Sequence, residues 1–331
     1  MQLVQLINSY DERRVCVVED NRLRVIDQHD SVYGLAQAAL AAGTTLPATV
    51  DRHLTPDQLD YDEIYEGRSE WRLLPPVDHP EEPARCTVSG TGLTHKGSAD
   101  NRQAMHAADT APTDSMRMFQ WGLEGGRPAP GQVGVSPEWF YKGPGTILRA
   151  HGQPLEVPSY AEDGGEEGEL AGVYLIDAAG VPRRLGMTVG NEFSDHRFEK
   201  KNYLYLAASK LRTCAIGPEL IVDPDYSSVP GEVAIERDGE VIWSKLIMTG
   251  DAAMSHTLEN MEHHHFKHGV HRRPGDIHIH FFGAAVLSFG EGIELNEGDI
   301  MQISFAGFGR PLRNPVHIAR SAETLVTVQP L

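Results

Sequence analysis

The stretch GEEGELAGVYLID, residues 165–177, decides the fold together with VPRRLGMTVGNEFSD, residues 181–195, which follows after a short turn. Each is an apolar run, and the turn between them ends in glycine, so the pair predicts two antiparallel buried strands. Further along, EVAIERDGEVIWS, residues 232–244, repeats this pattern around an Asp-Gly hairpin signal. Short apolar runs alternate with Gly, Pro and Asp turns from Gly145 onward. The region is therefore expected to be mainly β.

The composition agrees with this interpretation. The chain has 331 residues, of which 40% are hydrophobic, enough to build a substantial core. Its 33 glycines and 21 prolines favour a fold with many tight turns over a helix bundle. The expected class is α+β with mostly β structure.

The chain is expected to fold as a small N-terminal α/β domain, residues 1–75, a linker at 76–84 and a main domain at 85–331. The proline-rich, acidic sequence LLPPVDHPEEPARC predicts the linker, and CTVSGTGL, from residue 86, predicts the first strand beyond it. A long mobile insertion is expected around residues 107–134, of the kind that often covers an active site.

Three segments have the pattern of helices. They are VYGLAQAALAAG (32–43), LYLAASKL (204–211) and SHTLENMEHHHFKHG (255–269). Ser255 begins the last of them, and its hydroxyl is expected to cap the first turn.

The net charge of −18 leaves no continuous basic stripe, which argues against nucleic acid or an anionic membrane as a partner. No apolar stretch reaches the length of a membrane span, and the first residues lack a basic start followed by an apolar run. The three cysteines are odd in number and widely spaced, so neither a disulfide framework nor a thiolate zinc site is expected. We expect a soluble cytoplasmic protein.

Three glutamates form the candidate metal site. Glu167 and Glu169 lie two residues apart at the start of a strand, so their side chains project from the same face. An isolated pair of this kind is more often the acidic end of a hairpin. Glu192 follows the next apolar run, however, and a hairpin would bring it beside the pair. Oxygen-only ligation by carboxylates suits Mg²⁺, with Mn²⁺ and Ca²⁺ as alternatives.

A substrate that forms an enolate beside such an ion would need a nearby positive charge to stabilise it. Two lysines are candidates for this role, namely Lys142 in FYKGP and Lys210 in AASKLRTC. A lysine beside a metal can also act as a base when burial lowers its pKa. For either lysine alone, a solvated surface position is the default interpretation.

Five ordered blocks resemble the fumarylacetoacetate hydrolase superfamily. They are PEWFYKGPGTILRAHGQPLEVP, GEEGELAGVYLI, GMTVGNEFSD, ASKLRTCAIGP and LNEGDIMQISFAGFGRPLRNPV, and they cover most of residues 85–320. Within it, SGTGLTHKGSA, SHTLENMEHHHFKHG and HIHFFGAA resemble the branch of 2-keto-3-deoxy-sugar-acid dehydratases. The resemblance implies a mixed β-sandwich roll that binds Mg²⁺ through Glu167, Glu169 and Glu192.

The resemblance also implies which residues meet the substrate. Lys210 matches the family's substrate-contacting lysine and Lys142 the lysine after the aromatic residue, with Phe140 shaping the pocket. The family usually has Asp where this chain has Glu192. Its substrate-binding Gly-Thr pair falls on Gly283 and Ala284, where a hydroxyl is missing.

In the hydrolases of the superfamily, a lid His and a Glu three residues later activate water. Here Ser98 and Asn101 stand in their places, which argues against hydrolysis by that pair. His95 and His106 are close enough in sequence to replace it as acid or base, and His95 is the preferred candidate, although a loop histidine is more often a structural hydrogen-bonding group.

Two other patterns in the sequence each have two interpretations. The histidines include His263, His264, His265 and His268 on an expected helix and His278 and His280 on an expected strand, which raises Zn²⁺ or Fe²⁺ binding as an alternative to polar packing. The glycines of SGTGLTHKG match neither the dinucleotide-binding nor the P-loop spacing. We do not expect phosphate binding there.

These features together predict a Mg²⁺-dependent lyase that dehydrates a 2-keto-3-deoxy sugar acid, such as 2-keto-3-deoxyarabinonate, through an enolate. The small-molecule substrate would be a 2-oxo acid, and the resemblance makes a homodimer or homotetramer the expected assembly. One alternative is a hydrolase that cleaves a C–C bond in an acylpyruvate or diketo acid. Another is a non-catalytic protein that binds a sugar acid, which Ala284 suggests.

Overall fold

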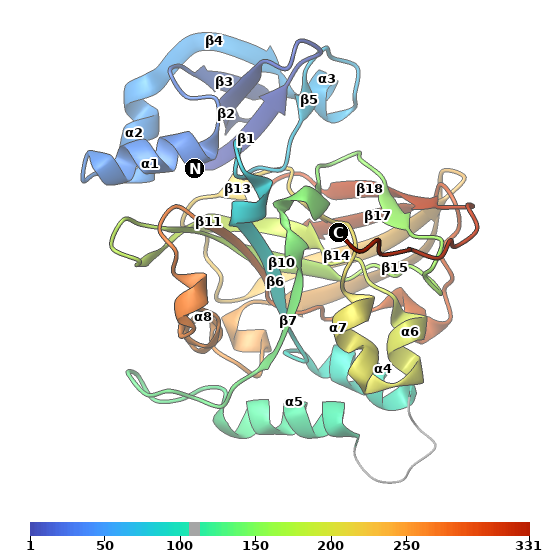
Figure 1. Ribbon diagram of the computed structural model, residues 1–331. Coiled ribbons are helices and arrows are strands. Elements are labelled where there is room, and N and C mark those ends of the chain that lie inside the picture. Colours follow the sequence, from blue (N-terminus) through green and yellow to red (C-terminus); the bar gives the residue numbers. More distant parts are fainter. Residues whose placement is uncertain (106–112) are drawn as a thin grey trace.

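A computed structural model describes residues 1–105 and 113–331 of the chain. Within this part, the strands form two sheets, one of 13 strands and one of 5 strands. Figure 1 shows the N-terminal unit in blue above a β-rich body, with the helices α4 to α7 at the opposite end. The expected class, α+β with mostly β structure, is confirmed.

The N-terminal unit consists of a small antiparallel meander and three helices. Its elements are β1 (Gln2–Ile7), β2 (Arg13–Glu19), β3 (Arg22–Ile26), α1 (Val32–Ala41), α2 (Leu46–His53), β4 (Leu54–Asp60), α3 (Tyr61–Tyr65) and β5 (Arg72–Leu73). The hydroxyl of Ser31 accepts a hydrogen bond from the backbone N–H of Gly34 and so caps α1, which confirms the helix expected at 32–43.

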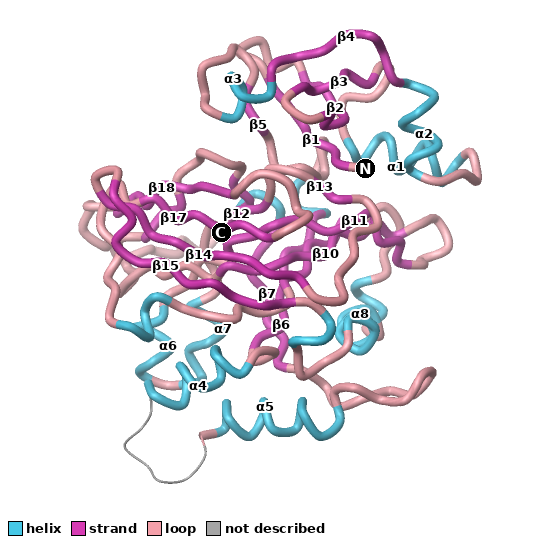
Figure 2. The backbone as a smooth tube through the Cα atoms, turned by 180° about the vertical axis from the view of Figure 1, so that it is seen from behind, coloured by secondary structure: helices cyan, strands magenta, loops and turns pink. Residues whose placement is uncertain are grey.

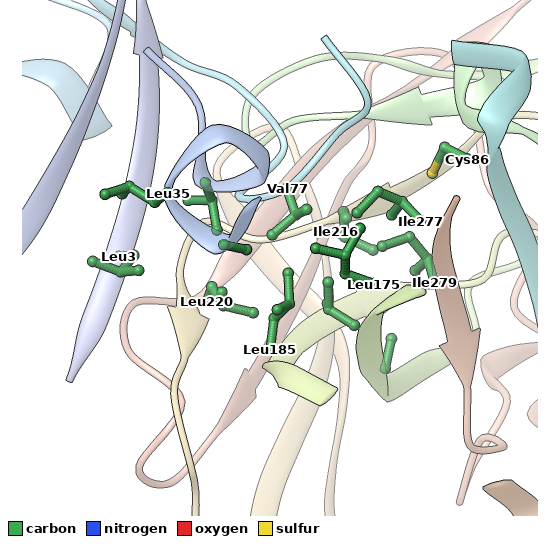
Figure 3. Close-up of a cluster of buried hydrophobic side chains, with 14 of the residues drawn as sticks. Leu3, Leu35, Val77, Cys86, Leu175, Leu185, Ile216, Leu220, Ile277 and Ile279 are labelled. Atoms are coloured by element: carbon green, nitrogen blue, oxygen red, sulfur yellow. The ribbon is translucent and has the colours of Figure 1, made fainter. Parts of the chain in front are cut away.

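The strands of the N-terminal unit continue directly into the large sheet. Strand β1 pairs antiparallel with β13 (Leu220–Ile221), with Leu3 opposite Leu220. One hydrophobic cluster also crosses the junction, and it contains Leu3, Leu35, Val77, Leu175 and Ile279 (Figure 3). Division of the chain at residues 76–84 stays a prediction.

The large sheet mixes antiparallel and parallel pairs. Its other strands are β6 (Cys86–Gly92), β7 (Glu138–Pro144), β8 (Leu148–Arg149), β10 (Gly168–Ile176), β11 (Pro182–Asn191), β12 (Cys214–Ile216) and β16 (Ile277–Phe281). Strands β10 and β11 form the antiparallel pair that the opening stretch predicts. Strand β6 runs parallel to β16, and β7 lies at the edge of the sheet order.

The small sheet packs against the large one. It contains β9 (Leu155–Val157), β14 (Val229–Arg237), β15 (Glu240–Thr249), β17 (Ile300–Phe305) and β18 (Leu312–Ile318). Asp238 and Gly239 join β14 to β15 with φ of 53° and 84°, the left-handed conformation of the expected Asp-Gly hairpin. Leu170 and Val189 of the large sheet share a buried cluster with Val233 and Ile303 of the small one. The expected mixed β-sandwich is thereby confirmed.

The helices of the body are mostly short. They are α4 (Lys96–Met105), α5 (Asp114–Gly125), α6 (His196–Lys201), α7 (Leu206–Ser209) and α8 (Leu258–Phe266), and Figure 2 shows α4, α5 and α6 at the end opposite the N-terminal unit. The one-turn 3₁₀ helices are η1 (Pro83–Arg85), η2 (Gly145–Ile147), η3 (Tyr203–Tyr205), η4 (Asp251–Ala253), η5 (Gly269–His271) and η6 (Ser288–Glu291).

The mobile insertion expected around 107–134 stays a prediction, and within it the structure places the helix α5, whose first turn is capped by the hydroxyl of Thr113. One local expectation needs correction. Ser255 does not cap α8, because the helix begins three residues later and Thr257 supplies the capping hydroxyl to the N–H of Asn260. Residues 106–112, including His106, lie outside the described residues. Among the described residues, none of the helices is long and apolar enough to cross a membrane.

Candidate metal centre

The pairing of β10 with β11 brings the three glutamates together. Glu169 lies on β10 opposite Gly190, and the N–H of Glu192 donates to the carbonyl of Glu167 at 2.9 Å. All three side chains are buried, and each offers a carboxylate oxygen within 4.8 Å of the others. Among the described residues, no other group of three or more His, Cys, Asp or Glu side chains meets this criterion.

Both predicted lysines lie inside this site, and both are completely buried. Lys210 Nζ is 2.6 Å from Glu167 Oε1 and 2.6 Å from Glu192 Oε2. Lys142 Nζ is 2.6 Å from Glu192 Oε1 and donates to the carbonyl of Phe193 at 2.7 Å. The default interpretation of solvated surface lysines is wrong for both, because β7 and the turn after α7 direct them into the core.

The carboxylates differ in electrostatic environment. Burial raises the pKa of Glu169 well above its ordinary value, with further increases from Glu192 and Glu167. Burial, then the charge of Glu167, raises the pKa of Glu192 to about 7, against the opposing effect of the lysines. The pKa of Glu167 is held well below its ordinary value despite burial, because Lys210 and then His196 stabilise its charge.

The donor set fits a hard divalent cation. When ionised, three carboxylates carry one negative charge more than two ammonium groups, and buried excess charge is costly without a partner. Oxygen ligands that converge from a rigid hairpin match the preference of Mg²⁺, Mn²⁺ and Ca²⁺. Glu167, Glu169 and Glu192 are therefore the residues that would hold such an ion.

The other predicted site residues lie around these carboxylates. The Phe140 ring centroid is 4.8 Å from Lys210 Nζ. The backbone N–H of Gly283 donates to Glu169 Oε2 at 2.6 Å. A Cβ at this position would come within 2.1 Å of Thr94 Oγ1, so only glycine fits there. Ala284 is buried beside it, with only a methyl group to offer.

Ser98 and His95 are both buried and both satisfied within the protein. Ser98 Oγ donates to the carbonyl of His95 at 3.0 Å, at the beginning of α4. The ring of His95 lies between two hydroxyls, with Nδ1 2.9 Å from Thr94 Oγ1 and Nε2 3.0 Å from Thr249 Oγ1. Burial lowers the pKa of His95 to about 4. Their roles in substrate binding and catalysis stay predictions, and the side chain of Asn101 is not among those described.

Two polar residues of the site were missed by the sequence reasoning. His196 Nε2 lies 3.0 Å from Glu167 Oε1. Glu138 is buried on β7, on the face that Phe140 and Lys142 share. The spacing of Glu138 two and four residues before Phe140 and Lys142, both predicted site residues, was the available signal for it. Nothing local marked His196, because its partner is distant in sequence.

A separate group of rings, which we call the histidine cluster, consists of the buried His265, His278 and His280 and the half-buried His271. His265 Nε2 lies 3.0 Å from His278 Nδ1, and His280 lies between the hydroxyls of Ser89 and Thr91 at 2.9 and 2.8 Å. Burial is the main cause that lowers the pKa values of His278 and His280 to about 3. The geometry supports polar packing here over the alternative of Zn²⁺ or Fe²⁺.

No family model matches this chain. Its sequence is 30% identical over 179 residues to a "Probable 2-keto-3-deoxyxylonate dehydratase" of Haloferax volcanii, a match that covers 52% of this chain and 58% of that protein. The matched part of this chain thus spans a little over half the length of that relative.

Solved structures match over nearly the whole chain. The structure of a 2-keto-3-deoxy-D-arabinonate dehydratase complexed with magnesium and 2,5-dioxopentanoate has a TM-score of 0.71 at 21% identity, covering 97% of this chain and 100% of that one. A 5-carboxymethyl-2-hydroxymuconate delta-isomerase from Mycobacterium smegmatis has a TM-score of 0.59 at 19% identity, covering 96% and 100%. The fold expected from the five sequence blocks is confirmed.

Proposed function

We propose that the protein is a Mg²⁺-dependent lyase that dehydrates a 2-keto-3-deoxy sugar acid, such as 2-keto-3-deoxyarabinonate. The observation that carries this proposal is the buried convergence of Glu167, Glu169 and Glu192 with two buried lysines. Bound there, Mg²⁺ supplies Lewis-acid polarisation to the substrate's carboxylate and 2-oxo group. Mn²⁺ or Ca²⁺ would suit the same oxygen donors.

Dehydration removes a proton from C3 and hydroxide from C4, which leave together as water. Lys210 is the proposed catalytic residue for the first step, as the base for the C3 proton or as the cation beside the enolate. Its contacts with two carboxylates fix the position of its Nζ. Lys142 holds Glu192, and Phe140 limits the space beside Lys210.

The proposed substrate contacts also include Ser98, Gly283 and Ala284, with His95 as a second proton-transferring residue. Gly283 already donates its N–H to Glu169, so it would act close to the ion. Ala284 offers no hydroxyl, so other groups must bind the substrate carboxylate. The named relatives support the reaction class, since the matched proteins include dehydratases of 2-keto-3-deoxy acids.

The reaction can be tested with a panel of 2-keto-3-deoxy acids, acylpyruvates and diketo acids, incubated with the protein and Mg²⁺. Mass spectrometry of the products distinguishes loss of water, as a dehydratase requires, from addition of water with two carbon fragments, as a hydrolase requires. Binding without any product would support a sugar-acid-binding protein and contradict the enzyme.

We also propose a homodimer or homotetramer in the cytoplasm. Strand β15 lies at the end of the small sheet's strand order, and it exposes Leu246 and Met248 at 85% and 47%. An exposed apolar edge strand supports pairing with a second copy. Sedimentation velocity tests the assembly.

The proposal of a cytoplasmic location has separate support. The three cysteines are free, which supports a reducing compartment.

A further inference from the structure

His196 contacts Glu167, one of the three carboxylates of the metal centre, from outside that group. Its Nε2 lies 3.0 Å from Glu167 Oε1, the oxygen that also accepts a hydrogen bond from Lys210 at 2.6 Å. The imidazole is 1% exposed. It begins α6 directly after Asp195, whose carboxylate caps the helix and pairs with Arg212 at 3.0 Å. The backbone that carries the ring is therefore fixed independently of Glu167.

The ring is also confined on its two sides. A Cβ on Gly165 would come within 2.2 Å of His196 Nδ1, so the imidazole packs directly against the Gly165 backbone. That backbone is held by two hydrogen bonds with Ser194, at 2.9 and 3.0 Å. The ring of Phe289 lies 5.4 Å from the imidazole, centroid to centroid.

The position of Phe289 is set by a second buried carboxylate. Glu166 accepts hydrogen bonds from the N–H and the hydroxyl of Ser288, both at 2.7 Å, and Ser288 begins the turn η6 that carries Phe289. Glu166 and Glu167 are adjacent in the chain, yet Glu166 contacts Ser288 whereas Glu167 contacts His196. Glu166 fixes the support of the imidazole, and Glu167 receives its hydrogen bond.

The second nitrogen of this ring, Nδ1, is buried. Among the described residues, none lies within hydrogen-bonding distance of the buried Nδ1 of His196. Leaving a buried polar group unsatisfied costs about 1–3 kcal/mol, so a ring kept only for packing would be better replaced by an apolar one. The cost is explained if the Nε2 contact has a function.

We propose that His196 is a positioning residue that orients the Glu167 carboxylate toward a divalent ion, with Gly165, Phe289 and the Glu166–Ser288 contact holding the ring in place. This inference rests on the proposed function, because it assumes that the three glutamates bind an ion. Lys210 joins Glu167 to Glu192, whereas His196 contacts Glu167 alone. Its loss therefore removes one of the two contacts of Glu167 Oε1 and leaves the contacts of Glu192 and Glu169 unchanged.

The test is the affinity of the whole protein for Mn²⁺, measured by electron paramagnetic resonance of free Mn²⁺ in the absence of substrate. His196→Leu should weaken Mn²⁺ binding about 10- to 100-fold, the usual effect of losing an outer partner of a metal ligand. His196→Gln should recover most of the affinity, because its amide N–H can donate to Glu167. His317→Leu, which removes a surface imidazole 3.2 Å from Glu297, is the matched control and should bind as the wild type does.

Equal Mn²⁺ affinity in the wild type and a folded His196→Leu variant would overturn the inference. Loss of binding in His196→Leu without recovery in His196→Gln would also contradict it, since the hydrogen bond would then not be the cause. If His196→Leu does not fold, Gly165→Ala provides the second test: it displaces the ring without removing a polar group, and unchanged affinity in it would overturn the inference. A wild type that binds no Mn²⁺ would instead overturn the proposed function, and this inference with it.

Discussion

The metal centre and the histidine cluster are both groups of buried polar side chains, but they reach stability by opposite means. In the metal centre, ammonium groups contact carboxylates at 2.6 Å, so ionised groups compensate one another. In the histidine cluster, the neighbours of the rings are hydroxyls, an indole and other imidazoles. Such neighbours can form hydrogen bonds with neutral rings but offer no compensation for a charge, and the buried Nε2 of His278 has no partner among the described residues.

This difference separates a site built for a charged ligand from one built for packing. In the metal centre, burial raises the pKa of Glu169 and Glu192 and so disfavours their charged forms, which a bound cation would stabilise. In the histidine cluster, burial and the nearby imidazoles lower the pKa of His265, His278 and His280, so these rings are neutral at neutral pH. Equal burial thus leads to ion pairs in the metal centre and to neutral rings in the histidine cluster, because the neighbouring groups differ.

The largest expected effect comes from removing one carboxylate of the metal centre. Glu169→Gln should reduce the proposed dehydration on the order of 10³-fold, because an ion contributes several kcal/mol to stabilising the developing charge. EDTA should abolish turnover of the wild type, and added Mg²⁺ should restore it. Glu240→Gln, at an exposed position of β15, is the control. Full activity of Glu169→Gln, and of the wild type in EDTA, would show that the three glutamates do not bind a catalytic ion. The metal centre would then not differ from the histidine cluster in having a charged ligand.

Removing a cation from the same site should cost stability. Lys210→Met leaves Glu167 and Glu192 without their common partner, and breaking a buried ion pair costs about 3–5 kcal/mol. The loss should be seen as a lower midpoint of urea unfolding. Adding Glu192→Gln to this variant should recover part of it. The exposed Lys200→Met is the control, and an equal effect in both single variants would contradict the argument.

The histidine cluster should respond to acid. Unfolded imidazoles titrate near pH 6.5, whereas His278 and His280 have a folded pKa of about 3, so the unfolded chain binds more protons between these values. Their stabilising contribution is complete above pH 6.5 and decreases as the pH falls, by about 2 kcal/mol for each ring at pH 5.

Urea unfolding at pH 7, 6 and 5 measures this dependence. The double variant His278→Gln, His280→Gln should lose less stability between pH 7 and 5 than the wild type, whereas the exposed His317→Gln should not differ from it. If the double variant lost as much stability between pH 7 and 5 as the wild type, His278 and His280 would not be the source of the acid sensitivity.

The smallest effect concerns a single hydroxyl. Thr91 is buried, and its Oγ1 lies 2.8 Å from His280 Nε2. Thr91→Val keeps the volume but leaves the ring nitrogen unpaired, at a cost of about 1–3 kcal/mol in unfolding free energy. Proposed activity should be retained, since the change is in the histidine cluster. The exposed Thr327→Val is the control, and no difference between the two would contradict the assigned hydrogen bond.

Much of the metal centre could be predicted from the sequence, since two apolar strands joined by a short turn bring Glu192 near Glu167 and Glu169. The exact pairing of Glu169 with Gly190 depends on a β-bulge between Val173 and Tyr174, which the sequence pattern does not reveal. The five blocks likewise identified Lys142 and Lys210, and the family's Gly-Thr pattern pointed to Gly283. The helix α5 was missed because Gly, Pro and Met around it obscured its periodicity. Ser255 was mistaken for a cap, since both it and Thr257 have suitable hydroxyls and only the backbone decides between them.

The sequence by itself determined the α+β class, the β10–β11 hairpin and the three glutamates, because these depend on local periodicity and on residues joined by one turn. Only the tertiary structure decided that both lysines are buried, that His196 reaches Glu167, and that the histidines pack together as neutral rings. These contacts join residues that are far apart in the chain. Burial and neighbouring charge, which govern their protonation and reactivity, are properties of the folded arrangement.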